Sequence, residues 1–133
     1  MFIVKIDFTM KRKVYHSEVD QLIEIGTYIY KQLGHGFQDH VYRDVMELEL
    51  DLRNIPYIRE EVYQNKEAVE NVNFVCFDKI IVDLNTHSYL TDEQEDLFLN
   101  KLEELDSPIG LLFNFGHENL QFIKVGDQVV CSE

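Results

Sequence analysis

An apolar segment in the last quarter of the chain constrains the fold most. Residues 109–113 read IGLLF, and only Gly110 among them lacks an apolar side chain. A short, unbroken apolar run is typical of a strand that is buried on both faces of a sheet. Such a sheet needs cover on both sides, and helices are the usual cover. We therefore expect an α/β fold in which helices cover a central sheet.

Three segments have the residue spacing and end signals of helices. Ser17 suits a helix N-cap, and Gly34 suits the end of that helix. A second helix should begin near Asp39 and stop at Asn54 and Pro56. The third should begin at a capping box formed by Thr91 and Gln94 and end at residues 106–108.

Apolar residues at helical spacing predict which helix faces are buried. In the first helix they are Val19, Leu22, Ile23, Gly26, Ile29, Tyr30 and Leu33. In the second they are Val41, Val45, Leu48 and Leu52, and in the third Leu99 and Leu102, followed by Leu105. Tyr28, Ile29 and Tyr30 are adjacent and cannot all face one core. Part of the first helix is therefore expected to form an exposed aromatic surface for a partner.

Strands are predicted between and around these helices. The segments are 2–8, 57–63, 72–77, 79–84 and 109–113, then a hairpin of 120–125 and 128–131 across Gly126. Residues 64–71 are expected to form a polar turn, and Asp78 a tight reversal between two strands. No linker or repeat interrupts the 133 residues, so we expect a single domain over 1–133.

The overall composition limits the classes of function. Twenty-five acidic residues against twelve basic ones give a formal net charge of −13, which repels nucleic acid at long range. A protein partner is therefore expected, and the sequence also allows a homo-oligomer. No apolar run reaches the roughly eighteen residues that span a bilayer. Cys76 and Cys131 suit a reducing compartment, so a cytoplasmic protein without a membrane anchor is expected.

Several short blocks resemble one known family. Residues 34–42 read GHGFQDHVY, which resembles the signature of the GxxExxY proteins, a group within the PD-(D/E)XK nuclease superfamily. Gly36 and Tyr42 stand at the signature positions, and Asp39 replaces the glutamate. The likeness continues in four further blocks in the same order, LELDLRNIP, IIVDLN, LTDEQEDLFLNKL and GLLFNFG, and spans about residues 17–125. The predicted first strand lies outside it.

This resemblance implies a restriction-endonuclease-like domain with a mixed central sheet flanked by helices. It also implies where such a domain would keep its chemistry. A nuclease of this fold uses carboxylates that converge on Mg²⁺, a cation that prefers oxygen ligands. The metal activates a water and stabilises the charge that develops on the phosphate, and a lysine assists.

At each implied site position this sequence departs from the family. Asp39 and Asp83 are shorter than the glutamates they replace, and Asn73 stands where an aspartate opens the motif. Asn85 replaces the lysine, and Leu97 replaces a glutamine on the following helix. The resemblance therefore implies a degenerate site, with Asp39 and Asp83 as its remaining metal-ligand candidates.

Three functions follow from these departures. The first is a catalytically degenerate nuclease-like protein that acts through protein contact and needs no cofactor. The second is a residual Mg²⁺-dependent DNA nuclease that uses Asp39, Asn73 and Asp83, with Lys79 or Lys101 as a displaced lysine. The third is a small-molecule binder in the vacated cleft, made more apolar by Leu97.

Two other groupings have simpler structural explanations. Asp78, Asp83 and His87 include ligands for a transition metal, but they lie on a strand and the loop after it. Cys76 stands among Phe74, Val75 and Phe77, which predicts core packing rather than a nucleophile. His35 and His40 are expected at the surface.

Overall fold

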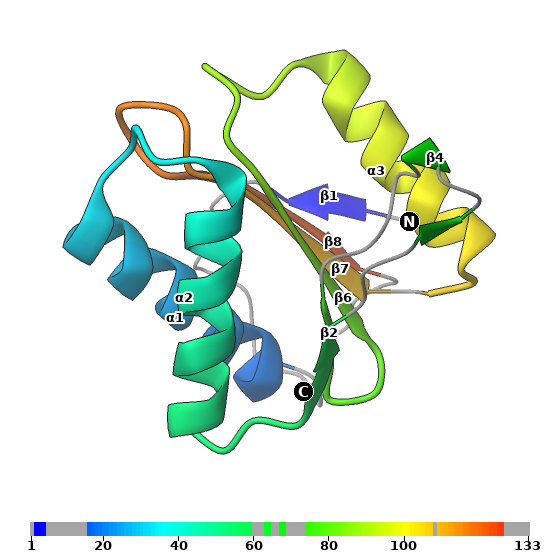
Figure 1. Cartoon of the computed structure of the whole chain (residues 1–133). Coiled ribbons are helices and arrows are strands. Elements are labelled where there is room, and N and C mark those ends of the chain that lie inside the picture. The colour runs from blue at the N-terminus through cyan, green and yellow to red at the C-terminus, as the bar shows by residue number, and fades with distance from the viewer. Residues whose placement is uncertain are drawn as a thin grey trace.

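A computed structural model describes the chain in six stretches, residues 2–4, 16–59, 63–64, 67–68, 74–107 and 109–126. Its elements in chain order are β1 (Phe2–Val4), α1 (His16–Leu33), α2 (Asp39–Leu52), β2 (Tyr57–Arg59), β3 (Tyr63–Gln64), β4 (Glu67–Ala68), β5 (Phe74–Cys76), β6 (Ile80–Asn85), α3 (Asp92–Glu104), β7 (Ile109–Asn114) and β8 (Gln121–Gly126) (Figure 1).

One sheet forms the centre of the fold. Its strand order is β1-β8-β7-β6-β5-β2, and β3 pairs separately with β4. β6 and β7 run parallel, from the pair Ile80–Ile109 to the pair Asn85–Asn114, and every other pairing in the sheet is antiparallel. α3 connects the two parallel strands, as a parallel crossover requires.

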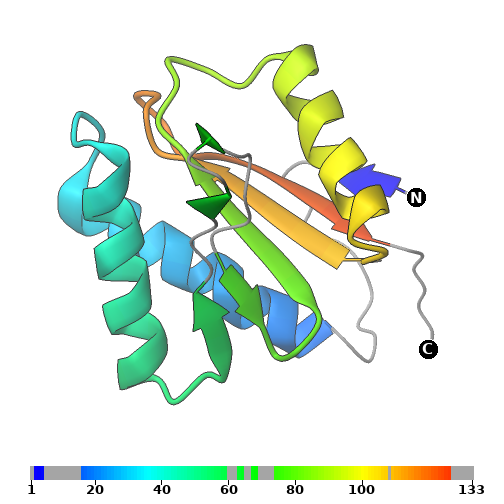
Figure 2. The same ribbon diagram turned by 45° about the vertical axis from the view of Figure 1, so that its right-hand side comes forward.

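The helices cover opposite faces of this sheet, with α1 and α2 on one side and α3 on the other (Figures 1 and 2). The face under α1 and α2 carries the larger apolar cluster, which includes Leu22, Tyr42, Phe74 and Phe113. The face under α3 carries a smaller one, Ile81, Phe98, Leu102, Leu112, Ile123 and Val125. The expected mixed α/β fold with a helix-flanked sheet is confirmed.

β7 is the centre of both apolar layers. All six of its residues are buried, as the apolar run predicts. Two glycines allow the helices to approach it closely. A Cβ on Gly26 of α1 would overlap the ring of Phe113, and a Cβ on Gly110 would lie 2.8 Å from the ring of Phe98 on α3. The strand is thus packed by a helix on each face.

Most predicted helix ends agree with the structure. Thr91 and Gln94 form both bonds of the capping box, and α2 begins at Asp39. Asn54 takes a left-handed conformation (φ 58°) just after α2. The predicted cap at Ser17 is wrong, because α1 already begins at His16.

The predicted buried stripe of the second helix is wrong. Its core-facing residues are Tyr42, Met46 and Leu50, whereas Leu48 and Leu52 are 54% and 66% exposed. α2 carries two apolar stripes, and the aromatic and longer side chains of one fill the space above the sheet. In α3, likewise, Phe98 and Leu102 are buried and Leu105 is exposed.

The strand predictions agree in the centre and differ at the edges. Phe77 and Asp78 both have positive φ (55° and 65°) and form the expected tight reversal between β5 and β6. Residues 64–71 were expected to be a polar turn, but the short antiparallel pair of β3 and β4 includes Gln64 and residues 67–68. Residues 5–8, 60–62, 72–73 and 128–131 of the predicted strands lie outside the described residues. No helix in the described stretches is both long enough and apolar enough to cross a membrane.

Candidate functional site

Asp83, Leu84 and Asn85, here called the D-L-N block, lie on β6. Strand alternation points their side chains to different faces. Val82 and Leu84 belong to the apolar cluster under α1 and α2, and Ile81 belongs to the cluster under α3. Successive side chains of a strand point to opposite faces, so Asp83 and Asn85 face α3. Asp83 is 5% exposed, and it is one of the few buried polar residues in the described part of the chain.

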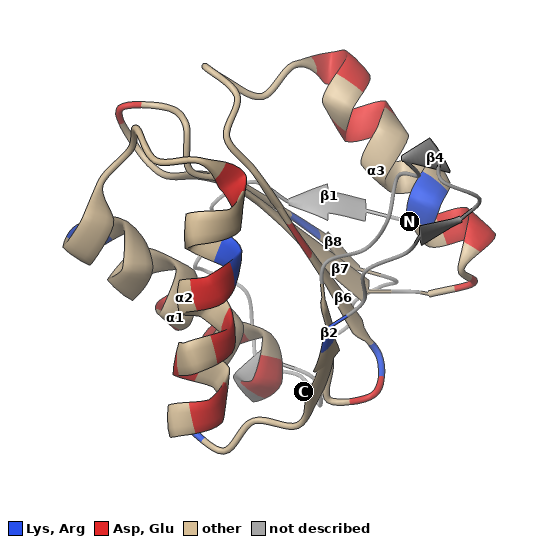
Figure 3. Ribbon diagram, viewed as in Figure 1, with Lys and Arg blue, Asp and Glu red and all other residues tan. Residues whose placement is uncertain are grey.

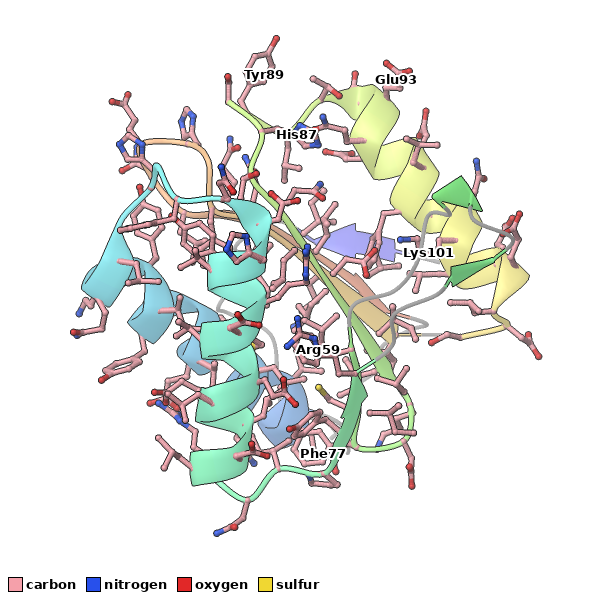
Figure 4. The ribbon with its side chains drawn as sticks, viewed as in Figure 1. Arg59, Phe77, His87, Tyr89, Glu93 and Lys101 are labelled. Carbon is pink, nitrogen blue, oxygen red and sulfur yellow. The ribbon has the colours of Figure 1, made fainter. Side chains whose placement is uncertain are left out.

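Lys101 of α3 meets this buried carboxylate. Its Nζ lies 2.5 Å from Asp83 Oδ2, and the two side chains are only 17% and 8% exposed (Figure 4). The helix register explains the contact, because Phe98 and Leu102 anchor α3 to the sheet and Lys101 lies on the same side of the helix. One displaced lysine proposed from the sequence therefore lies beside Asp83.

The other lysine, Lys79, lies elsewhere. Its Nζ is 2.7 Å from Glu18 Oε1 in the first turn of α1. It ties the turn between β5 and β6 to the helix on the opposite side of the sheet from α3. Only Lys101 of the two is brought to the D-L-N block.

Asp39 is held at the N-terminus of α2. Thr86, just after β6, donates a hydrogen bond to Asp39 Oδ1, and Arg43 lies 3.8 Å from Asp39 Oδ2. These contacts connect the start of α2 to the carboxyl end of β6. Thr86 directly follows the IIVDLN block, and no motif in the sequence marks it.

Buried Asn114 fixes the loop between β6 and α3. Its amide nitrogen donates to the main-chain oxygen of His87, 3.0 Å away, and its side-chain oxygen accepts from His87 N at 2.9 Å. Its amide also donates to Gln121 Oε1, which accepts from Leu90 N as well. The sequence analysis missed this residue, although a lone amide in the apolar block GLLFNFG was a usable signal.

The signature residues Gly36 and Tyr42 shape the turn before α2. Tyr42 donates its hydroxyl hydrogen to Gly34 O at 2.6 Å and accepts a longer hydrogen bond from Phe37 N. Its ring stacks on Phe115 at 4.6 Å, and burial raises its pKa. Gly36 has φ 111°, a conformation that side-chain-bearing residues rarely adopt. Both residues therefore build the turn that presents Asp39.

The remaining predicted positions divide into exposed and undescribed. Leu97 is 59% exposed on α3, so its side chain does not fill a cleft. Asn73 lies outside the described residues. Asp78 and His87 lie beyond opposite ends of β6, which separates them. His35 and His40 are exposed as expected.

Cys76 is buried in the core under α1 and α2, as predicted for a packing residue. Burial raises the pKa of its thiol to about 12. The thiolate, which is the nucleophilic form, is therefore disfavoured at neutral pH.

The family comparison agrees with this geometry. The model of the PD-(D/E)XK nuclease superfamily matches residues 16–125, which include all three helices and the sheet from β2 to β8. This chain belongs to that superfamily. No curated protein and no solved structure was found to match it.

The nuclease superfamily implies a Mg²⁺ ion, for which Asp39 and Asp83 are the candidate ligands in the described residues. Mg²⁺ takes octahedral oxygen ligands, normally one or two carboxylates together with several waters. The carboxylate of Asp83 is in contact with an ammonium group, and that of Asp39 accepts a hydrogen bond from Thr86. Among the stretches that the structure describes, no three His, Cys, Asp or Glu residues form a group that could hold a metal. These residues do not fit the ion.

Proposed function

We propose that this chain is a catalytically degenerate member of the PD-(D/E)XK superfamily, of the GxxExxY group, and that it acts by contact with a protein. The observation that carries the proposal is the ion pair of Lys101 with Asp83. An ammonium 2.5 Å from the carboxylate neutralises the charge on which a metal would depend.

Electrostatics explains why this pair opposes metal binding. A divalent cation at Asp83 would lie within a few ångströms of the positive Lys101 in a poorly solvated layer. Charges interact strongly in such an environment, so the lysine must move before the ion can bind. Asn85 supplies an amide oxygen but no charge to offset this repulsion. The described residues around Asp83 therefore favour the ammonium of Lys101 over a bound metal ion.

The charge of the whole chain supports contact with protein rather than with nucleic acid. A formal net charge of −13 repels phosphate backbones. Binding a phosphodiester normally requires a basic surface that displaces counterions. A homo-oligomer is compatible with the same proposal, and no cofactor is part of it.

Calorimetry and cleavage assays test the loss of activity. Titration with Mg²⁺ and with Mn²⁺ should give no binding heat beyond that of an Asp83→Ala variant. Incubation with single- and double-stranded DNA and either metal should leave the DNA intact. Cleavage by the unmodified chain that disappears in Asp83→Ala would overturn the proposal.

A residual Mg²⁺-dependent nuclease is the second candidate, and one observation favours it. Lys101 stands beside Asp83, and the ancestral reaction uses a lysine close to a metal-binding carboxylate. If this candidate is right, Lys101→Ala and Asp83→Ala both abolish cleavage. Lys79→Ala is the matched control, since Lys79 pairs with Glu18 and should leave cleavage unchanged.

The small-molecule alternative has less support. It relied on Leu97 to make a vacated cleft apolar, but this side chain is 59% exposed on α3.

A further inference from the structure

α2 has a second row of apolar side chains, of which Val45 packs partly against the core and the C-terminal members are exposed. Tyr42, Met46 and Leu50 face the sheet and are buried. A second row, Val41, Val45, Leu48 and Leu52, has the spacing i, i+4, i+7 and i+11 along the same helix. Its members become more exposed toward the C-terminal end, where Leu48 is 54% and Leu52 is 66% exposed.

Tyr28 of α1 extends this row onto the neighbouring helix. It is 41% exposed, and the guanidinium carbon of Arg53 lies 5.8 Å from the centroid of its ring. Arg53 follows Leu52 directly, so the tyrosine lies beside the exposed end of the row. We call Tyr28, Val41, Val45, Leu48 and Leu52 the outer seam. Single exposed apolar residues are ordinary, but a row shared by two packed helices is typical of an interaction surface.

The surroundings of the outer seam are acidic. α2 carries five carboxylates and one arginine in fourteen residues. Figure 3 shows acidic residues along the whole length of this helix. Asp44 is 63% exposed even though Arg59 binds it, and Asp51 and Glu24 are also exposed.

We infer that the outer seam binds a basic amphipathic helix of a partner protein. This inference rests on the proposed function, namely that the chain acts by protein contact. It adds which surface of the chain makes the contact and what chemistry the partner has. Apolar anchors of the partner would cover Leu48, Leu52 and Tyr28, and its Lys and Arg side chains would meet the carboxylates beside them. A helix laid on a row at i, i+4, i+7 and i+11 is a common mode of peptide recognition.

Charge selects this occupant over two others. A second copy of the chain would bring its own acidic α2 against the first, which opposes pairing through this face. An anionic membrane surface would be repelled by the same carboxylates. A basic helix gains from both the apolar row and the charge.

Peptide binding tests the inference. The probe is a labelled helical peptide of leucine and lysine with one apolar face, and its binding is measured by fluorescence anisotropy. Leu48→Gln and Leu52→Gln should each weaken binding at least about tenfold, because central apolar anchors dominate such contacts. Raising the salt concentration should weaken it further, since the charges are exposed.

Two controls make the result specific. Leu105→Gln removes a leucine that is 48% exposed on α3, at a different surface, and should leave peptide affinity unchanged. A peptide with glutamate in place of lysine should not bind. The inference would be overturned if Leu105→Gln lost as much peptide affinity as Leu48→Gln, or if the lysine peptide did not bind at all.

Analytical sedimentation tests the remaining alternative, in which the outer seam binds a second copy of the chain. A mass that doubles with concentration, and that Leu48→Gln returns to the monomer, would assign the outer seam to a second copy and overturn the basic-helix partner. The metal and DNA assays above fail or succeed independently of these results, because Leu48 and Leu52 belong to α2 and not to the D-L-N block.

Discussion

The two faces of the central sheet bury different kinds of side chain. Under α1 and α2 the contacts are apolar and aromatic, and Tyr42, Phe115 and Phe113 form a stacked row with centroids 4.6 and 5.9 Å apart. Under α3 a smaller apolar cluster shares its layer with Asp83 and Lys101.

The face under α1 and α2 is thus an apolar core, whereas the face under α3 also holds a buried ion pair. Burial of a charge is costly unless a partner compensates it, and an apolar pair of similar volume often serves stability as well or better. Packing alone therefore gives no reason for a carboxylate and an ammonium under α3. The proposed function gives one, because the family resemblance implies that Asp83 stands at a site position.

The largest effect is expected on the apolar face. Phe113 is fully buried between α1 and the sheet, so Phe113→Ala leaves a cavity as well as a loss of burial. We expect the free energy of unfolding to fall by about 3–5 kcal/mol. Urea unfolding measures this, and Leu105→Ala, at an exposed position, should change it by roughly 0.5 kcal/mol or less. If Phe113→Ala lowers the free energy of unfolding by less than the α3-face variant Lys101→Met does, our ranking of the two faces is wrong.

The ion pair on the other face should give the next effect. Lys101→Met leaves Asp83 as a buried charge without its ammonium partner, and a cost of about 3 kcal/mol is typical of a broken buried pair. Lys79→Met is the matched control. It breaks a pair whose side chains are both 30% exposed, so about 1 kcal/mol or less is expected.

A double-mutant cycle sharpens this result. Adding Asp83→Asn to Lys101→Met removes the buried charge that has lost its ammonium, so the double variant should be more stable than Lys101→Met alone. Strict additivity would mean that the two groups do not interact in solution, and the supporting observation for the proposed function would then be lost.

A smaller effect is expected at Asn114, at the edge of the polar layer. Asn114→Ala leaves the N–H and the carbonyl of His87 without their side-chain partner. A loss of about 2 kcal/mol is expected for such unsatisfied groups. Hydrogen exchange at the His87 amide should accelerate more than exchange in β7. Uniform acceleration of both would indicate global destabilisation without release of the loop.

The sequence predicted the parts of the fold that depend on local signals. The apolar run at 109–113 became the central strand, and the Thr91 and Gln94 pair became a complete capping box. Both depend on residues that are close in the chain, so a short stretch of sequence is enough to predict them. The family resemblance implied a mixed sheet flanked by helices, but it did not give the order of the strands in that sheet.

The sequence did not predict which surfaces meet. α2 has two apolar rows, and spacing alone does not tell the buried row of Tyr42 from the exposed row of Leu48. The same limit applies to the site. Lys79 and Lys101 were equal candidates in the sequence, and only the docking of α3 on the sheet brings Lys101 to Asp83.

The smallest expected effect is a pH dependence of the free energy of unfolding that comes from the Cys76 thiol. It tests whether the apolar face excludes water. Burial raises the pKa of its thiol from 9.0 to about 12. Above pH 9 the unfolded chain releases this proton and the folded chain keeps it, so the stability that it contributes falls as the pH rises. Between pH 8 and pH 10 the unfolding free energy should fall by about 1.4 kcal/mol more in the unmodified chain than in Cys76→Ala. Comparing the two proteins cancels the ionisation of tyrosines and of Cys131, which both chains share. Urea unfolding at the two pH values measures the difference, and parallel pH dependence would mean that the thiol ionises as readily in the folded core as in the unfolded chain.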